Sequence, residues 1–146
     1  MEIRSVLFVG RRNAARSVMA ETCFNAAEIP GWRAFSAGWQ TEHSVDRNAV
    51  KTLAANGFPT DTLSSKPVAI FLQAGAPAID LCVFMDEDLP PDVGNYPAAR
   101  QYWKIPDPSR SRDVKAAHQK ALEAIMEKIS MLVISGALTL PLAKAS

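Results

Sequence analysis

The sequence has few of the side chains on which many small enzymes depend. Among its 146 residues, only two are cysteine and two are histidine. Cys23 and Cys82 lie in apolar segments without metal-ligand spacing, and His43 and His118 are far apart in the chain. We therefore expect no disulfide, no metal site and no bound cofactor.

Excess charge of one sign and long apolar runs are also missing. The formal net charge is +1, which argues against a nucleic-acid partner or an anionic membrane surface, so that any charge-driven binding must be local. No apolar run approaches the roughly 18 residues of a spanning helix. The first residues lead into a strand pattern without the features of a signal peptide. A cytoplasmic chain is the expectation.

What remains is an ordinary globular composition. Apolar residues make up 48% of the chain and charged residues 21%, which indicates a compact core and no disorder. The length suits one domain better than two. We expect a single domain over residues 1–146, of which about 135–146 form a loosely held tail.

Short apolar runs that end at turn residues predict buried parallel strands. Four are expected, at residues 6–9, 33–37, 79–85 and 100–105. Because helical patterns separate them, the predicted fold is α/β: a three-layer αβα domain around a small, about four-stranded, doubly wound parallel sheet. Such folds bind ligands at the carboxyl ends of the strands, where residues near 10–17, 36–40, 86–96 and 105–110 should converge.

Apolar repeats of three and four residues predict the helices. Ser17 and Asp46 are the expected N-caps of the first two. A short helix is possible at 67–72, and residues 86–99, rich in Pro, Asp and Gly, indicate a long loop. The apolar face of the first helix is Ala20, Cys23, Phe24 and Ala27, and that of the last is Leu122, Ile125, Met126, Ile129, Leu132 and Val133.

One segment combines the features of an anion site. Residues 10–17, Gly-Arg-Arg-Asn-Ala-Ala-Arg-Ser, join the first strand to the first helix. Unpaired N–H groups and the dipole at a helix start favour a bound anion, and a guanidinium can donate to two of its oxygens. Asn13 tolerates the left-handed backbone that lets such N–H groups converge. The alternative is a plain strand-to-helix turn with solvated arginines, and composition alone does not choose between them.

Residues 6–21, VLFVGRRNAARSVMAE, resemble the signature of the low-molecular-weight tyrosine phosphatase superfamily: an apolar strand, then Cys-x-x-Asn-x-x-Arg-Ser and a Met-Ala-Glu-like helix start. Further segments are similar to its arsenate reductase branch, namely 35–38 (FSAG), 65–67 (SKP), Asp80, 103–108 (WKIPDP) and 140–142 (LPL). The resemblance spans almost the whole chain. It implies the αβα fold of that superfamily.

The resemblance also implies roles for single residues. In active relatives, the cysteine that opens the loop attacks phosphorus or arsenic and the arginine that closes it binds oxygens. The next serine steadies the thiolate, and the aspartate of an Asp-Pro pair is the general acid. Arg16, Ser17 and Asp107 match three of these, but Gly10 stands at the nucleophile position. Because Gly10 has no side chain, it cannot form a covalent intermediate.

No other thiol is an obvious substitute. Cys23 and Cys82 are better explained as small core residues. The arsenate reductases resemble each other in having a redox cysteine just after the third strand. This chain has Met-Asp-Glu-Asp there, at residues 85–88, and no cysteine. The implied redox step is therefore missing as well.

The sequence thus predicts a catalytically inactive homologue that binds phosphate, sulfate, arsenate or a phosphorylated protein. The residues expected at the anion are Arg11, Arg12, Asn13, Ala14, Ala15 and Arg16. Two alternatives stay open: an active phosphatase or arsenate reductase with an altered site or an unnatural residue at Gly10, and an interaction protein whose loop is a relic. Trp39, Tyr96 and Trp103 either line the mouth of the site or are packing residues.

Overall fold

The computed structural model describes residues 3–41 and 44–138. Its elements, in chain order, are β1 (Arg4–Val9), α1 (Arg16–Ala26), β2 (Trp32–Ala37), α2 (Arg47–Ala55), α3 (Ala69–Leu72), β3 (Leu81–Phe84), α4 (Pro91–Gly94), β4 (Ala99–Tyr102), the 3-10 helix η1 (Pro108–Arg110) and α5 (Val114–Ile134). His43, the segment at 140–142 and the tail beyond 138 lie outside the described residues.

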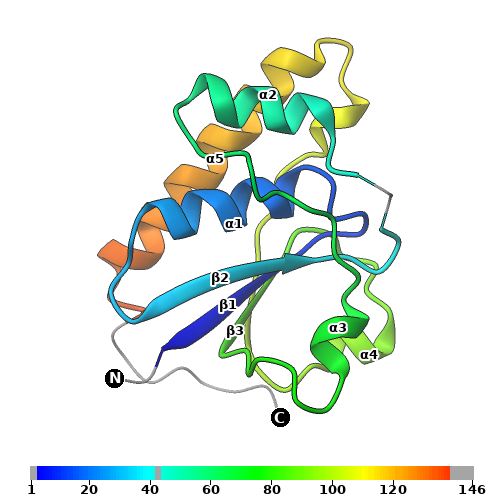
Figure 1. Ribbon diagram of the computed structural model, residues 1–146, viewed down its shortest axis with the longest axis vertical. Coiled ribbons are helices and arrows are strands. Elements are labelled where there is room, and N and C mark those ends of the chain that lie inside the picture. Colours follow the sequence, from blue (N-terminus) through cyan, green and yellow to red (C-terminus); the bar gives the residue numbers. More distant parts are fainter. Residues whose placement is uncertain (1–2, 42–43, 139–146) are drawn as a thin grey trace.

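The sheet is parallel throughout, with the strand order β2-β1-β3-β4. One face is covered by α1, α2 and α5, and the other by α3 and α4 (Figure 1). The predicted three-layer α/β fold is confirmed. Because all strands run the same way, their carboxyl ends meet at one edge, to which β1 delivers the loop that begins at Gly10.

The two cysteines lie on opposite faces of this sheet. Cys23, on α1, belongs to the core beneath α1, α2 and α5, whereas Cys82, on β3, belongs to the core beneath α3 and α4. Both thiols are free and buried. Burial raises the pKa of each to about 12, although Arg100 partly opposes this at Cys82. The prediction that they are core residues is confirmed.

The structure confirms one of the two predicted helix caps and contradicts the other. Asp46 is the N-cap of α2 and accepts a hydrogen bond from the backbone N–H of Asn48 at 2.8 Å. Ser17, by contrast, lies inside α1, whose N-cap position is Ala15 and has no side-chain cap. The prediction for Ser17 was wrong because its hydroxyl has another partner in the loop, described below.

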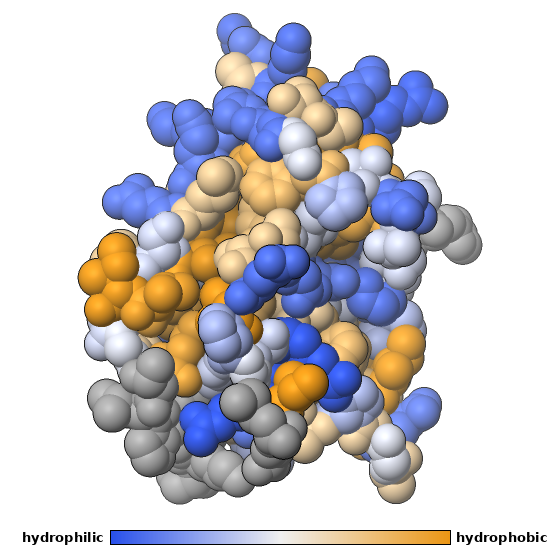
Figure 2. All heavy atoms as spheres, turned by 60° about the vertical axis from the view of Figure 1, so that its left-hand side comes forward, coloured by the Kyte–Doolittle hydropathy of each residue, from blue (hydrophilic) through white to orange (hydrophobic). Residues whose placement is uncertain are grey.

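The apolar face of α5 is narrower than predicted, whereas α1 buries Val18 and Met19 in addition to the predicted Ala20, Cys23 and Phe24. In α5, Leu122, Ile125, Ile129 and Leu132 are buried, whereas Met126 and Val133 are 42% and 48% exposed. Each exposed residue follows a buried one by a single position, which turns it by about 100° around the helix. Ala27 is exposed for a different reason, since it lies at the C-cap after α1. Figure 2 shows apolar atoms gathered on the side of the molecule where α5 ends.

Several boundaries differ from the prediction around β3 and β4. The stretch expected to be one long loop contains α4 and the first residue of β4. β4 then ends at Tyr102 rather than at 105, because the chain turns away from the sheet toward the Asp107-Pro108 pair. After α5, Leu138 is buried and its carbonyl accepts from Trp32 Nε1 at 3.0 Å, so the first residues of the expected tail pack on the core.

Two further properties concern the described ranges only. Within residues 3–41 and 44–138, no helix has both the length and the apolar character needed to cross a membrane. In the same part of the chain, no group of three or more His, Cys, Asp or Glu side chains is placed to hold a metal ion.

Candidate functional site

The loop between β1 and α1 is folded around Asn13. This residue has φ +50°, the left-handed conformation expected from the sequence, and is 1% exposed. Its Nδ2 donates to Ser17 Oγ at 2.8 Å, and its Oδ1 accepts from the backbone N–H of Lys66 at 2.7 Å. The side chain therefore ties the loop to α1 on one side and to the segment before α3 on the other.

The carbonyl groups of the loop are engaged by the segments around it. Arg11 O accepts from the N–H groups of Trp39 and Gln40 at 3.0 and 2.8 Å, and Ala14 O accepts from Asp46 N at 2.8 Å. Among the described residues, no group accepts from the backbone N–H groups of residues 13–17, which line a cavity. The loop thus presents donors to that cavity.

Gly38, just after β2, allows this close approach. A Cβ atom there would lie 2.6 Å from the carbonyl oxygens of Gly10 and Arg11 and 2.8 Å from the backbone nitrogen of Asn13. Contacts of that length with backbone atoms do not occur in folded chains. Glycine is therefore required where the end of β2 meets the loop.

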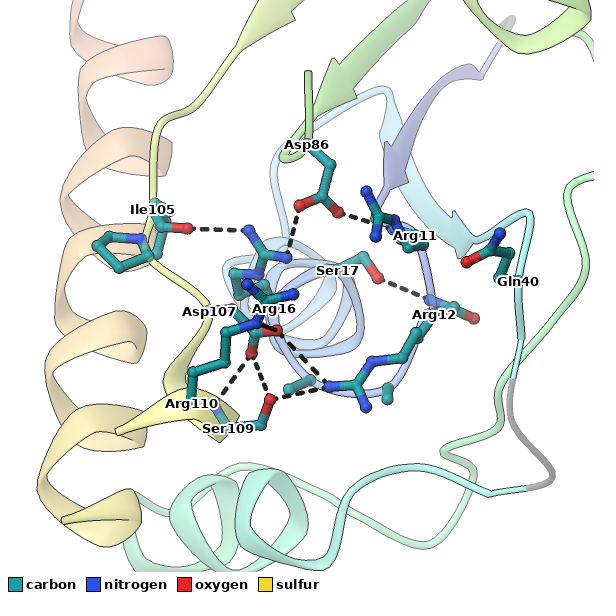
Figure 3. Close-up of a pocket in the computed structure, with 15 residues that line it drawn as sticks. Arg11, Arg12, Arg16, Ser17, Gln40, Asp86, Ile105, Asp107, Ser109 and Arg110 are labelled. Atoms are coloured by element: carbon teal, nitrogen blue, oxygen red, sulfur yellow. Dashed lines mark hydrogen bonds and ion pairs between the residues drawn. The ribbon is translucent and has the colours of Figure 1, made fainter. Parts of the chain in front are cut away.

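Arg16 closes the loop with a fixed guanidinium. Its Nη1 donates to the carbonyls of Met85 and Ile105 at 2.8 and 2.9 Å, and its Nη2 donates to Asp86 Oδ1 at 2.9 Å. Figure 3 shows this side chain held between Asp86 and Ile105. A guanidinium has five N–H donors. No described residue accepts from Nε or from the second Nη2 proton, so these remain for a ligand.

Asp86 binds both sides of the loop. Besides the ion pair with Arg16, its Oδ2 accepts from the backbone N–H of Arg11 at 2.8 Å. The sequence analysis placed the segment 86–96 at this edge but did not name Asp86 as a site residue. Its place at the carboxyl end of the third strand was the available signal, because strand ends of parallel sheets gather at one edge.

Asp107 is held as a carboxylate at the cavity wall. Its Oδ1 accepts from the backbone N–H and the hydroxyl of Ser109 at 3.0 and 2.7 Å. Burial raises the pKa of Asp107, but the hydrogen bonds from Ser109 and the charges of Arg16 and Arg12 outweigh it, so that the net pKa is lowered from 3.8. At neutral pH, this carboxyl has no proton to donate.

These groups surround one cavity of about 640 Å³. Its lining comprises Gly10, Arg11, Arg12, Asn13, Ala14, Ala15, Arg16, Ser17, Gln40, Asp86, Ile105, Pro106, Asp107, Ser109 and Arg110. Four arginines face two aspartates there, so the lining is positively charged. Every predicted site residue lies at this cavity. Gln40, Asp86, Ser109 and Arg110 line it too, and they belong to the segments 36–40, 86–96 and 105–110 that the sequence analysis placed at this edge without naming these four residues. Arg11 also pairs with Asp88 at the surface.

The aromatic residues considered for the mouth of the site do not line this cavity. Trp39 and Tyr96 pack against the core under α3 and α4, and Trp103 is 3% exposed within the other core. Trp103 packs on Phe8 with ring centroids 5.4 Å apart. Packing is thus the correct explanation for them.

The floor of the loop has room for a side chain that Gly10 lacks. A Cβ atom at Gly10 would lie 3.4 Å from Ser17 Oγ, 3.7 Å from Ser17 Cβ and 3.8 Å from Asp86 Oδ2, which are ordinary or slightly close contacts. Neither Cys23 nor Cys82 lines the cavity. The loop therefore surrounds its centre with donors and offers no thiol to it.

Comparison with known proteins identifies the family. Residues 5–138 match the family described as low molecular weight phosphotyrosine protein phosphatase. The chain belongs to this family. An arsenate reductase from Archaeoglobus fulgidus DSM 4304 is 31% identical, with a TM-score of 0.70 over 88% of this chain and 98% of that one. A search of curated proteins found no match.

Two other solved members of this fold were determined with ligands. An arsenate reductase in a phosphate binding state is 22% identical, with a TM-score of 0.71 over 91% of this chain and 98% of that one. The Vibrio vulnificus protein Wzb, in complex with benzylphosphonate, is 20% identical, with a TM-score of 0.71 over 91% of this chain and 99% of that one. Arsenate reductases and tyrosine phosphatases thus share the architecture of this phosphatase-family chain.

Proposed function

We propose that this member of the phosphatase family binds a tetrahedral oxyanion in the loop of residues 10–17 and does not transform it. The observation that carries the proposal is the set of N–H groups at 13–17 from which no described residue accepts, around a cavity that Arg16 closes. Such a cradle complements the oxygens of phosphate, sulfate or arsenate. A phosphorylated side chain of a partner protein in the cytoplasm would present the same group.

The proposed inactivity rests on two features of the site. Gly10 occupies the position at which the family signature has its nucleophilic cysteine, so that no phosphoenzyme or arseno-thiolate bond can form. Asp107, at the general-acid position, is held ionised by Ser109, Arg16 and Arg12. The proposed site thus lacks both the group that would attack and the proton that would leave with the product.

Loss of a thiolate favours binding. Two unit charges about 4 Å apart at an effective dielectric near 20 repel by roughly 4 kcal/mol, and Gly10 brings no such charge to the anion. Asp86 remains nearby, but its charge is paired with Arg16 at 2.9 Å. The two relatives solved with phosphate and benzylphosphonate support an oxyanion as the ligand class.

A thermal-shift measurement tests binding. Phosphate, arsenate and sulfate, each at on the order of 10 mM, should raise the melting temperature, because an anion that binds only the folded chain stabilises it. Arg16→Ala should abolish the shift. The control is Arg112→Ala, since Arg112 is exposed and does not line the cavity. An unchanged melting temperature with all three anions would contradict the proposal.

Activity assays test the proposed absence of catalysis. Hydrolysis of an aryl phosphate and dithiol-dependent reduction of arsenate should both be undetectable with the purified chain. Turnover that persists on repurification and disappears in Arg16→Ala would show an active enzyme instead.

A further inference from the structure

Asp86 is part of the ring of groups that surrounds the proposed anion. Its Oδ2 accepts from the backbone N–H of Arg11 at 2.8 Å, at the start of the loop, and its Oδ1 accepts from Arg16 Nη2 at 2.9 Å, at the end of the loop. Figure 3 shows the carboxylate between these two residues. An anion that takes the donors of residues 13–17 would therefore have Asp86 as its neighbour.

The carboxylate of Asp86 can accept further hydrogen bonds. Its two oxygens offer about four lone-pair sites. Within residues 3–41 and 44–138, only Arg11 and Arg16 donate to it. Asp86 also lines the cavity, and its side chain is only 20% exposed, so that little water competes for the remaining sites. A ligand in the cavity thus meets an acceptor as well as donors.

An acceptor at an anion site distinguishes ligands by their protons. Hydrogenphosphate and hydrogenarsenate keep one O–H group at neutral pH, and this group can donate to a carboxylate. Sulfate has the same charge and a similar shape but no proton, so that one of its oxygens would face a carboxylate oxygen with no hydrogen between them. That contact is unfavourable in a site with little water, because it brings two negative acceptors together without a donor.

The second carboxylate at the cavity, Asp107, is less suited to this role. Its Oδ1 accepts both from the backbone N–H and from the hydroxyl of Ser109, and its Oδ2 lies 3.6 Å from Arg12 Nη2. The hydrogen bonds of Asp107 therefore go to η1, whereas those of Asp86 go to the two ends of the loop that would hold the anion.

We infer that Asp86 selects oxyanions that carry a proton, so that the ligand is hydrogenphosphate or hydrogenarsenate rather than sulfate. The inference rests on the proposed binding of an oxyanion at residues 10–17. The N–H groups and Arg16 bind the unprotonated oxygens of the ligand, and its single O–H group donates to Asp86. A phosphorylated side chain has lost its last proton in slightly alkaline solution, so the same selection disfavours a phosphorylated partner there.

Calorimetric titration of the whole chain with phosphate, arsenate, sulfate and methyl phosphate tests the inference, in slightly alkaline buffer of constant ionic strength. Phosphate should bind with a dissociation constant lower than that of sulfate by about tenfold or more, the increment of one hydrogen bond to a charged group. Arsenate should share this advantage, and the tighter of the two names the preferred ligand. Methyl phosphate, which has no proton in this buffer, should bind as weakly as sulfate.

Substitution of Asp86 tests which residue selects. Asp86→Asn should reduce the ratio of the sulfate and phosphate dissociation constants to about threefold or less. The reason is that the asparagine amide can turn its NH₂ group toward an unprotonated oxygen. The control Asp61→Asn removes the same charge from an exposed position outside the cavity and should keep the full ratio. Equal gains for both anions in Asp86→Asn would contradict the inference, because they would indicate general repulsion by the carboxylate.

The outcomes separate the inference from the function on which it rests. Equal affinities of the wild type for phosphate and sulfate would overturn the selection and leave oxyanion binding intact, whether or not Asp86→Asn folds. Methyl phosphate that binds as tightly as phosphate would overturn it too. A ratio lost in Asp107→Asn but kept in Asp86→Asn would assign the acceptor to Asp107 and reject Asp86. Failure of all four anions to bind would overturn both the selection and the proposed function.

Discussion

Asn13 Nδ2 donates a hydrogen bond of 2.8 Å to Ser17 Oγ across the first turn of α1. This bond fixes the serine hydroxyl 3.4 Å from the position that a Cβ atom of residue 10 would occupy. In active relatives, as the family resemblance implies, the equivalent serine steadies the thiolate. The chain therefore keeps the support for a group that Gly10 does not provide.

Substitution of Asn13 should loosen the loop by two separable effects. Asn13→Ala removes two hydrogen bonds and forces alanine into a left-handed backbone, and should lower the free energy of unfolding by about 3 kcal/mol. Asn13→Gly removes the same bonds without the backbone strain and should cost about 1 kcal/mol less. Urea unfolding measures both. Equal losses would show that the φ of +50° at Asn13 stores no strain.

Gly38→Ala should displace the loop, because the added methyl group would lie 2.6 Å from two backbone oxygens. We expect a loss of about 1–3 kcal/mol in the free energy of unfolding, together with loss of the phosphate-induced thermal shift. Gly94→Ala is the matched control, since its Cβ would lie 3.6 Å from the Leu89 side chain. A full thermal shift in Gly38→Ala would contradict the required close approach.

Gly10→Cys should fold normally and acquire a limited activity. The thiol would attack an aryl phosphate, but Asp107 is ionised and cannot protonate the leaving group. Hydrolysis of p-nitrophenyl phosphate, whose leaving group needs little protonation, should therefore become detectable. Phenyl phosphate should react roughly 10²-fold or more slowly, the usual contribution of a general acid.

The control for the Gly10→Cys experiment is Gly10→Ala. Gly10→Ala fills the same space without a nucleophile and should hydrolyse neither ester. If Gly10→Cys cleaves both esters at similar rates, then Asp107 does donate a proton, and the proposed reason for inactivity is incomplete.

Acid should remove the stabilisation that Asp107 provides. A carboxyl whose pKa is lower in the folded chain stabilises it fully above the unfolded value, here 3.8, and that contribution is lost as the pH falls through the folded pKa. We expect Asp107→Asn to be less stable than the wild type at about pH 6, and the difference to narrow at about pH 3. Urea unfolding at both values measures it, and a difference that does not change with pH would contradict the lowered pKa.

The sequence predicted the layers of the fold and most of the loop, because both depend on local patterns. Buried parallel strands appear as continuous apolar runs, and the family signature at residues 6–21 identifies the strand, the loop and the helix start together. Asn13 was correctly expected in a left-handed conformation because few other residues tolerate it.

What the sequence missed depends on contacts between distant segments. Ser17 resembles an N-cap locally, but Asn13 engages its hydroxyl within the folded loop. The segments 86–96 and 105–110 were expected near the loop, but only the way in which the ends of β3 and β4 meet it determines that Asp86 and Arg110 are among the side chains at the site. Met126 and Val133 fit an apolar repeat, yet only the packed structure determines how wide a stripe α5 buries.

The burial of both cysteines should make the chain resistant to oxidation. Because burial raises the pKa of Cys23 and of Cys82 to about 12, neither supplies the exposed thiolate that hydrogen peroxide attacks. A loop that binds its ligand through amide and guanidinium groups has nothing for peroxide to oxidise. This chain should therefore keep its ligand affinity under oxidative stress that would inactivate a relative with a thiolate in the loop.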